Sequence, residues 1–364
     1  MSRDAATLLD PFALGPLALR NRAVMAPMTR SRAHDHVPNE LMVRYYAQRA
    51  SAGLIVSEGT APSPNGQGYP RMPGIHTTAQ ITAWREVTDA VHARGGTIFS
   101  QLMHCGRVAH PDNQPDGAEV VAPSAVPITE KKMWVDTEEA WVSMPVAREM
   151  TEEDVETTID EYVRAATSAR AAGFDGIELH GANGYLIEQF LSPHTNRRDD
   201  AWGGDVERRL RFATEVTRRC CDAIGADRVG IRLSPYGTLG EMVRYDAIDA
   251  TYTRLAERLD ALGVAYVHLC DHATFRQSPL PDAMKERIRA TFGGPLILAG
   301  GYDLERANAD LSAGRADLIG FARAFLANPD LVERFARGSA LNEADPDTFY
   351  TAGAEGYVDY PTLD

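Results

Sequence analysis

Three polar side chains that could act on a carbonyl group lie within six residues. The stretch His180-Gly181-Ala182-Asn183-Gly184-Tyr185 puts His180 and Asn183 three positions apart, so both can project to the same side of a turn or helix start. Two neutral hydrogen-bond donors converging on one oxygen would polarise a carbonyl and stabilise enolate charge. Tyr185 offers a phenol that can deliver a proton. A lone histidine is more often a core or capping residue, but three such groups together favour a catalytic interpretation.

A second candidate is Arg232, which stands between Ile231 and Leu233 in an apolar run. A guanidinium in a dry strand needs an anionic or strongly accepting partner. The partner is either a bound ligand or an ion pair with Glu58 or Glu178, and the sequence leaves both open. Gln101 ends another apolar run, and its amide is suited to reading a planar heterocycle.

Glycines and an arginine near the end of the chain predict an anion site. Gly300 and Gly301 end one apolar run, and Arg323 follows Ala322 at the end of the next. Backbone N–H groups at such strand ends, backed by a short helix, commonly bind phosphate, and Arg323 would add charge-assisted hydrogen bonds. The alternative is glycines for tight turns and an arginine bonded to local carbonyls. With Arg232, this pattern describes one long ligand with a polar ring system and a phosphate, which fits flavin mononucleotide (FMN).

A metal site is the competing interpretation, because His268-Leu269-Cys270-Asp271-His272 and His104-Cys105 contain possible ligands. The first apolar run carries no His-x-His pair, and no other group supplies the three or four convergent ligands that zinc requires. We therefore expect no metal. Cys220 and Cys221 diverge on a predicted helix and are expected to pack in the core.

All these residues stand at the ends of short apolar runs that alternate with amphipathic segments. The runs predict eight strands, at 22–28, 54–60, 97–103, 176–181, 229–234, 266–270, 295–301 and 318–323. The segments between them predict helices at 41–52, 81–94, 155–172, 206–224, 247–262, 283–292, 304–313 and 329–337. Eight such units predict an α/β fold, the (β/α)₈ TIM barrel. An open doubly wound sheet would need a glycine-rich phosphate loop after the first strand, where the sequence reads Thr29-Arg30-Ser31-Arg32.

Two segments fall outside this repeat. Residues 106–150, rich in Pro and Asp and containing Trp134 and Trp141, follow the third strand and are predicted to cap one end of the barrel. Residues 339–364 form a polar tail that is expected to reach the active site. No linker or duplication divides the chain, so residues 1–364 are predicted to form a single domain. Glycines such as Gly53, Gly263 and Gly293 precede strands, where left-handed helix caps are expected.

The composition excludes several classes of protein. The 364 residues include 37 Lys+Arg and 51 Asp+Glu, a net charge of −14 that disfavours nucleic acid as a partner. No apolar stretch is long enough to span a membrane, and residues 1–10 lack the pattern of a signal peptide, so a cytoplasmic location is expected. The four cysteines are too scattered for a disulfide framework and are predicted to be reduced, buried thiols.

Together these residues resemble the Old Yellow Enzyme family of FMN-dependent ene-reductases. The matching segments occur in family order over nearly the whole chain: Asn21-Arg22, Ala26-Pro27-Met28-Thr29-Arg30, Ser57-Glu58-Gly59-Thr60, Gln101-Leu102-Met103-His104-Cys105-Gly106-Arg107, His180 to Leu186, Arg232-Leu233-Ser234-Pro235, Ala322-Arg323, Asn328-Pro329-Asp330-Leu331, and Gly356-Tyr357 with Asp359-Tyr360-Pro361. Thr29, where another branch has Cys, resembles the branch typified by the yeast and enterobacterial members.

The resemblance implies noncovalent FMN and a role for each matching residue. The isoalloxazine would be surrounded by Pro27, Met28, Thr29, Gly59, Gln101 and Arg232, with Thr29 bonded to flavin O4, and the phosphate would be held by Gly301, Ala322 and Arg323. His180 and Asn183 would bind the carbonyl or nitro oxygen of a small-molecule substrate, and Tyr185 would protonate its α-carbon. Tyr69, Met103 and Tyr357 would line the substrate pocket. In the implied ping-pong mechanism, NADPH or NADH reduces FMN, which then passes hydride to the β-carbon of an activated alkene.

Two departures from the family pattern qualify the match. Met103 stands where many relatives carry a bulky aromatic residue, which predicts a more adaptable pocket floor. Ala322 replaces the usual glycine, which is compatible with phosphate binding if its backbone needs no positive φ. A dedicated biosynthetic reductase or isomerase, a non-catalytic flavin-binding protein and a metal-dependent barrel lyase are the alternatives, and the protein is expected to be a monomer or homodimer.

Overall fold

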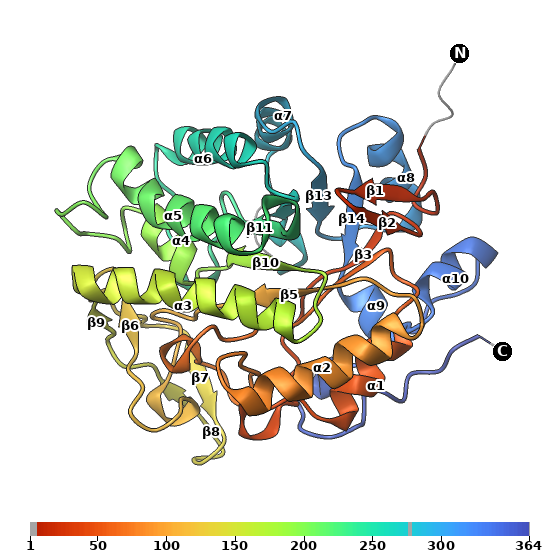
Figure 1. Ribbon diagram of the computed structural model, residues 1–364, viewed down its shortest axis with the longest axis horizontal. Coiled ribbons are helices and arrows are strands. Elements are labelled where there is room, and N and C mark those ends of the chain that lie inside the picture. Colours follow the sequence, from red (N-terminus) through yellow and green to blue (C-terminus); the bar gives the residue numbers. More distant parts are fainter. Residues whose placement is uncertain (1–5, 276–278, 364) are drawn as a thin grey trace.

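The computed structural model describes residues 6–275 and 279–363 and shows a closed barrel of eight parallel strands (Figure 1). Around the barrel the strands are β3 (Ala23–Met25), β4 (Leu54–Val56), β5 (Ile98–Leu102), β10 (Gly176–Gly181), β11 (Val229–Leu233), β12 (Tyr266–Cys270), β13 (Leu296–Ala299) and β14 (Leu318–Phe321). The predicted TIM barrel is confirmed. β10 and β12 have the predicted bounds, and the other six strands are shorter, chiefly because residues at their C-terminal ends belong to the loops.

The helices cover the outside of the strands in Figure 1. The eight predicted helices are α1 (Glu40–Gln48), α2 (Thr78–His92), α3 (Glu152–Ala171), α5 (Val206–Ile224), α6 (Ile248–Leu262), α7 (Asp282–Thr291), α8 (Leu304–Ser312) and α10 (Leu331–Arg337). Two further short helices were not predicted: α4 (Leu186–Leu191), directly after the His180–Tyr185 stretch, and α9 (Arg323–Ala327), which begins at the predicted phosphate arginine.

An N-terminal hairpin that sequence reasoning missed closes one end of the barrel. Its strands are β1 (Phe12–Leu14) and β2 (Leu17–Leu19), paired antiparallel. Leu14 and Leu19 are buried in one cluster with the barrel residues Val24, Phe99 and Tyr266. Because this hairpin closes the N-terminal ends of the strands, the barrel is open for ligands at the C-terminal ends.

Gly53, which precedes β4, is not the left-handed helix cap that the sequence predicts. Gly263 has the positive φ expected of a left-handed cap, 68°, but Gly53 and Gly293 have no positive φ. A Cβ atom on Gly53 would lie 2.0 Å from the backbone oxygen of Asn21. Close approach of two backbones, and not left-handed geometry, therefore requires glycine at position 53.

Residues 106–150 form the predicted excursion after the third barrel strand. They contain β6 (Val121–Ala122), β7 (Lys132–Val135), β8 (Ala140–Ser143) and β9 (Arg148–Glu149), with β7 and β8 paired as an antiparallel hairpin and β6 parallel to β9. The β7–β8 hairpin projects at the lower left of Figure 1. Its two tryptophans, Trp134 and Trp141, contact each other with ring centroids 5.8 Å apart.

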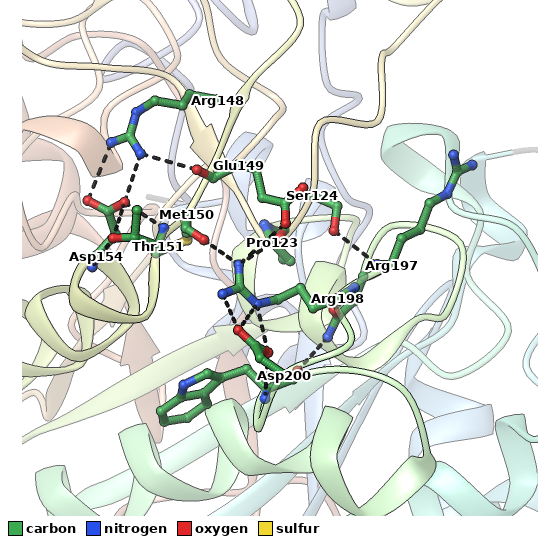
Figure 2. A network of polar contacts seen from close by, with 12 residues as sticks. Pro123, Ser124, Arg148, Glu149, Met150, Thr151, Asp154, Arg197, Arg198 and Asp200 are labelled. Carbon is green, nitrogen blue, oxygen red and sulfur yellow. Dashed lines mark hydrogen bonds and ion pairs between the residues drawn. The ribbon is translucent and has the colours of Figure 1, made fainter.

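Polar contacts fasten the middle and the C-terminal end of this excursion to the barrel (Figure 2). Arg198, in the loop after α4, donates to the backbone oxygens of Pro123 and Met150 and pairs with Asp200. At the far end of the excursion, Arg148 pairs with Asp154 at the start of α3 at 2.7 Å. The buried guanidinium of Arg198, bonded to two backbone carbonyls, gives this part of the excursion a defined position.

No helix in the described ranges, 6–275 and 279–363, is long and apolar enough to cross a membrane. All four cysteines are free and buried, as predicted.

Candidate active site

A cavity of about 660 Å³ opens at the C-terminal ends of the barrel strands. Thirteen of the residues singled out from the sequence line it: Pro27, Met28, Thr29, Tyr69, Gln101, Met103, His180, Asn183, Tyr185, Arg232, Gly301, Ala322 and Arg323. The structure therefore brings together, in one cavity, His180 and Asn183 (the predicted clamp for a carbonyl oxygen), Arg232 and the predicted phosphate-binding residues Gly301 and Arg323.

Two of the predicted residues lie elsewhere. Tyr357 is completely buried and stacks on Tyr45, with ring centroids 4.1 Å apart, so the prediction that it lines the substrate pocket is wrong. The guanidinium groups of Arg30 and Arg32 lie 5.0 and 4.8 Å from its ring centroid and hold it away from the cavity. Gly59 is outside the lining because the Met103 side chain covers it, and a Cβ on Gly59 would lie 2.6 Å from the Met103 sulfur.

Several lining residues were not identified from the sequence. The tail reaches the cavity through Phe349 and Tyr350 in place of Tyr357, and the excursion contributes Lys131, Lys132, Trp134 and Trp141. The sequence predicts that the excursion and the tail reach this end of the barrel, but which of their side chains line the cavity depends on loop conformations that a single sequence does not encode. The lining holds six Arg and Lys residues (Arg30, Arg71, Lys131, Lys132, Arg232, Arg323) and one acidic residue, Asp271. The cavity is thus basic inside an acidic protein, which suits an anionic ligand.

The clamp residues His180 and Asn183 face each other, with His180 Nε2 and Asn183 Nδ2 3.4 Å apart. His180 Nδ1 accepts from the backbone N–H of Ala182 at 3.3 Å, so the proton of the neutral ring is on Nε2. Burial, reinforced by Arg232, holds the pKa of His180 well below its usual value, so the ring stays neutral. Both facing atoms are therefore hydrogen-bond donors, and an oxygen placed between them would accept from both.

Tyr185 lies next to this clamp, with its ring centroid 4.8 Å from that of His180. Its hydroxyl donates to the hydroxyl of Tyr69 at 3.0 Å. Burial raises the pKa of both phenols above the usual value, so each keeps its proton at neutral pH. The pair can hold a proton inside the cavity, as general acid catalysis requires.

A buried polar network forms the floor of the cavity. Glu178 accepts from Gln101 Nε2 and from His268 Nδ1, both at 2.8 Å. Burial alone would raise the pKa of Glu178, but His268 and Arg232 outweigh burial and lower it. Because the carboxylate can only accept, it orients the Gln101 amide and leaves the carbonyl oxygen of Gln101 as an acceptor for a ligand in the cavity.

The surroundings of Arg232 decide between the two partners left open by the sequence, an ion pair with a glutamate and a bound ligand. Within the described residues it makes no ion pair with Glu58 or Glu178; its Nη2 contacts Cys270 Sγ at 3.2 Å, and its buried Nε has no partner. A buried, incompletely bonded guanidinium requires an acceptor from a ligand. An isoalloxazine ring has acceptor atoms that the Arg232 guanidinium can bond and an N–H group from which the Gln101 oxygen can accept a hydrogen bond. The residues of this chain therefore fit FMN.

The opposite end of the cavity fits a phosphate. Gly301 has φ 64°, whereas Ala322 has φ −98° and so needs no positive φ, which is the condition under which alanine can replace the usual glycine here. A Cβ on Gly300 would lie 2.7 Å from the backbone oxygen of Asp271, which explains a glycine there. Arg323 is exposed at the rim, with its guanidinium 5.9 Å from the ring centroid of Phe349.

The fold and this site define a class of protein, a flavin-dependent oxidoreductase on a TIM barrel. The chain matches the NADH:flavin oxidoreductase / NADH oxidase family over residues 7–342. A Leishmania infantum protein named "Probable flavin mononucleotide-dependent alkene reductase" is 40% identical over 365 residues, covering 100% of this chain and 99% of that protein. Morphinone reductase has a TM-score of 0.96 at 45% identity, covering 100% of this chain and 98% of that one. The Old Yellow Enzyme homologue from Zymomonas mobilis has a TM-score of 0.92 at 40% identity, covering 98% and 100%.

The chain belongs to the NADH:flavin oxidoreductase / NADH oxidase family. The predicted resemblance to the Old Yellow Enzymes, the class of enzyme, the FMN cofactor and a nicotinamide nucleotide as reductant are confirmed by this membership.

Proposed function

This enzyme is an alkene reductase that uses NADPH or NADH, and we propose that it acts on the activated C=C bonds of α,β-unsaturated carbonyl compounds and of nitroalkenes in a ping-pong reaction. The observation that carries the proposal is the clamp of His180 and Asn183 beside the Tyr185 phenol, in the same cavity as the incompletely bonded Arg232. When bound, FMN takes hydride from the nicotinamide and supplies hydride to the β-carbon of the alkene.

The chain's own residues supply binding, polarisation and the proton. His180 and Asn183 hold the carbonyl or nitro oxygen and stabilise the negative charge that develops on it. Tyr185 protonates the α-carbon, and Tyr69 keeps the Tyr185 hydroxyl in place. Tyr69 and Met103 form the substrate side of the cavity, while Pro27, Met28 and Thr29 lie on the cofactor side. The Thr29 hydrogen bond to flavin O4, the single domain, the cytoplasmic location and the monomer or homodimer stay predictions.

The test is the visible spectrum of the purified holoenzyme. We expect a bound flavin that NADPH or NADH bleaches without oxygen and that 2-cyclohexenone or a nitrostyrene restores, with release of the saturated product. Initial rates at several enone concentrations should give parallel double-reciprocal lines, as a ping-pong reaction requires. A flavin that neither nucleotide bleaches would overturn the proposal in favour of a binding protein. Turnover of a single compound from a broad enone panel would favour a dedicated reductase.

A further inference from the structure

The amide of Asn183 can lie in two orientations, and they have opposite consequences for the clamp. In the observed orientation Asn183 Nδ2 faces His180 Nε2 at 3.4 Å, so both donors are available to a substrate oxygen. Rotating the amide by half a turn would bring Oδ1 to His180, where it would accept the Nε2 proton. The clamp would then be satisfied internally, and one donor would be replaced by an acceptor.

His272 opposes that rotation. Its Nε2 lies 2.7 Å from Asn183 Oδ1, a distance at which the ring donates to the amide oxygen. The bond joins loops that follow β10 and β12, which are not neighbours in the barrel. The ring of His272 is 3% exposed, and it packs where Gly237 has no side chain: a Cβ on Gly237 would lie 2.5 Å from its Cε1.

The backbone of Asn183 is held independently of this bond. Asn183 has φ 61°, and its N–H donates to Ser234 Oγ at 2.9 Å. Ser234 donates in turn to Glu188 at 2.8 Å, and Glu188 also accepts the N–H of Gly184 at 2.6 Å. With the main chain fixed by these contacts, the rotation of the amide is the freedom that His272 removes.

We propose that His272 is a positioning residue that sets the orientation of the Asn183 amide and so keeps both clamp donors directed at the substrate oxygen. This inference rests on the proposed function of the clamp. Without the bond from His272, the amide is free to bond His180 instead. The free energy of a single hydrogen bond is enough to lower the fraction of molecules with both donors directed at the substrate by ~10-fold.

The test uses three substitutions in the FMN-loaded enzyme. His272→Phe keeps a ring and removes the donor, His272→Gln replaces the donor with an amide N–H, and His272→Glu offers an acceptor that favours the rotated amide. Two readouts are needed: the Kd of cyclohexanone, a carbonyl ligand without a reducible C=C bond, from its perturbation of the flavin spectrum, and kcat and KM for 2-cyclohexenone. We expect cyclohexanone binding to weaken by ~10-fold in His272→Phe and more in His272→Glu, with recovery in His272→Gln.

A double-mutant cycle with Asn183→Ala separates positioning from packing. If His272 acts through the amide, His272→Phe will have no further effect on cyclohexanone binding once Asn183 is Ala. Equal losses in both backgrounds, or unchanged binding in His272→Phe, would overturn the proposal; FMN content and thermal midpoint report on folding. Failure of the wild-type enzyme to bind cyclohexanone or turn over 2-cyclohexenone would instead refute the proposed function.

Discussion

Tyr185 and Tyr69 share one hydrogen bond inside the cavity, and both keep their protons because burial raises their pKa values. At the scale of single residues, this pair has one clear consequence. In the proposed mechanism the reacting alkene needs the Tyr185 proton and the flavin does not, because transfer of hydride from the nicotinamide to FMN requires no acid at that position. The two half-reactions should therefore respond differently to its removal.

We expect Tyr185→Phe to slow reoxidation of the reduced enzyme by 2-cyclohexenone by ~10²-fold, the usual contribution of a general acid, and to leave reduction by NADPH unchanged. Anaerobic stopped-flow measurement of each half-reaction checks this. Tyr69→Phe is the matched control, because it removes the acceptor of the Tyr185 hydrogen bond and leaves the acid in place; its effect should be smaller. An equal loss in both half-reactions of Tyr185→Phe would contradict the assigned role.

Among the elements, the tail is a segment that one buried side chain, Arg32, bonds at several points. Arg32 donates to the backbone oxygens of Thr348 and Phe349 at 2.8 Å and to Thr351 Oγ1 at 2.6 Å. Burial, together with the nearby Arg30, lowers the pKa of Arg32 to about 10, but the group stays charged at neutral pH. These bonds place Phe349 and Tyr350 in the cavity lining.

Arg32→Ala should loosen this segment, because the backbone oxygens of Thr348, Phe349, Gly353 and Glu355 lose a charged donor at once. We expect faster cleavage by chymotrypsin after Phe349 and Tyr350, together with a higher KM for enones. Arg337→Ala is the control, since Arg337 pairs with Glu333 at the surface of α10. Arg32→Lys should give an intermediate result, because a lysine cannot satisfy several carbonyls with a planar fork. Unchanged cleavage in Arg32→Ala would show that the tail is held by other contacts.

For the whole molecule, buried titratable groups predict how stability changes with pH. Burial raises the pKa of Glu58 and of Glu188 from 4.5 to about 7. A carboxyl group whose folded pKa is raised favours folding when protonated, so its contribution is complete below about pH 4.5 and is lost as the pH rises to 7. Burial lowers the pKa of His76 from 6.5 to about 4, so its contribution is lost in the opposite direction, as the pH falls below 6.5.

Glu188→Gln should remove the loss of stability with rising pH that the buried carboxyl of Glu188 causes. The amide stays neutral at every pH. As the pH rises from 4.5 to 8, the free energy of unfolding of the variant should therefore gain a few kcal/mol relative to that of the wild type, as measured by urea unfolding at each pH. Ser234 and Tyr252 can rotate their hydroxyls to bond the amide. Glu286→Gln, at an exposed position on α7, is the control and should follow the wild type at every pH. A pH-independent difference between Glu188→Gln and the wild type would contradict the prediction.

Local sequence patterns determined the elements and most of the chemistry of this protein. Apolar runs bounded by glycines predicted all eight barrel strands, because a parallel strand that is buried on both faces is largely apolar. The polar residues at the ends of those runs converge in one cavity because closing the barrel brings all C-terminal strand ends together. His180, Asn183, Tyr185 and Arg232 could therefore be assigned to one site from their places along the chain.

Only the tertiary structure decided how distant segments meet. Tyr357 was assigned to the pocket, but its ring is held on Tyr45 by the guanidinium groups of Arg30 and Arg32. His272, first weighed as a metal ligand, instead bonds Asn183 from a strand two places away. The periodicity of a sequence reports which face of an element is buried, whereas contacts between loops depend on barrel closure and side-chain rotamers, which no local pattern encodes.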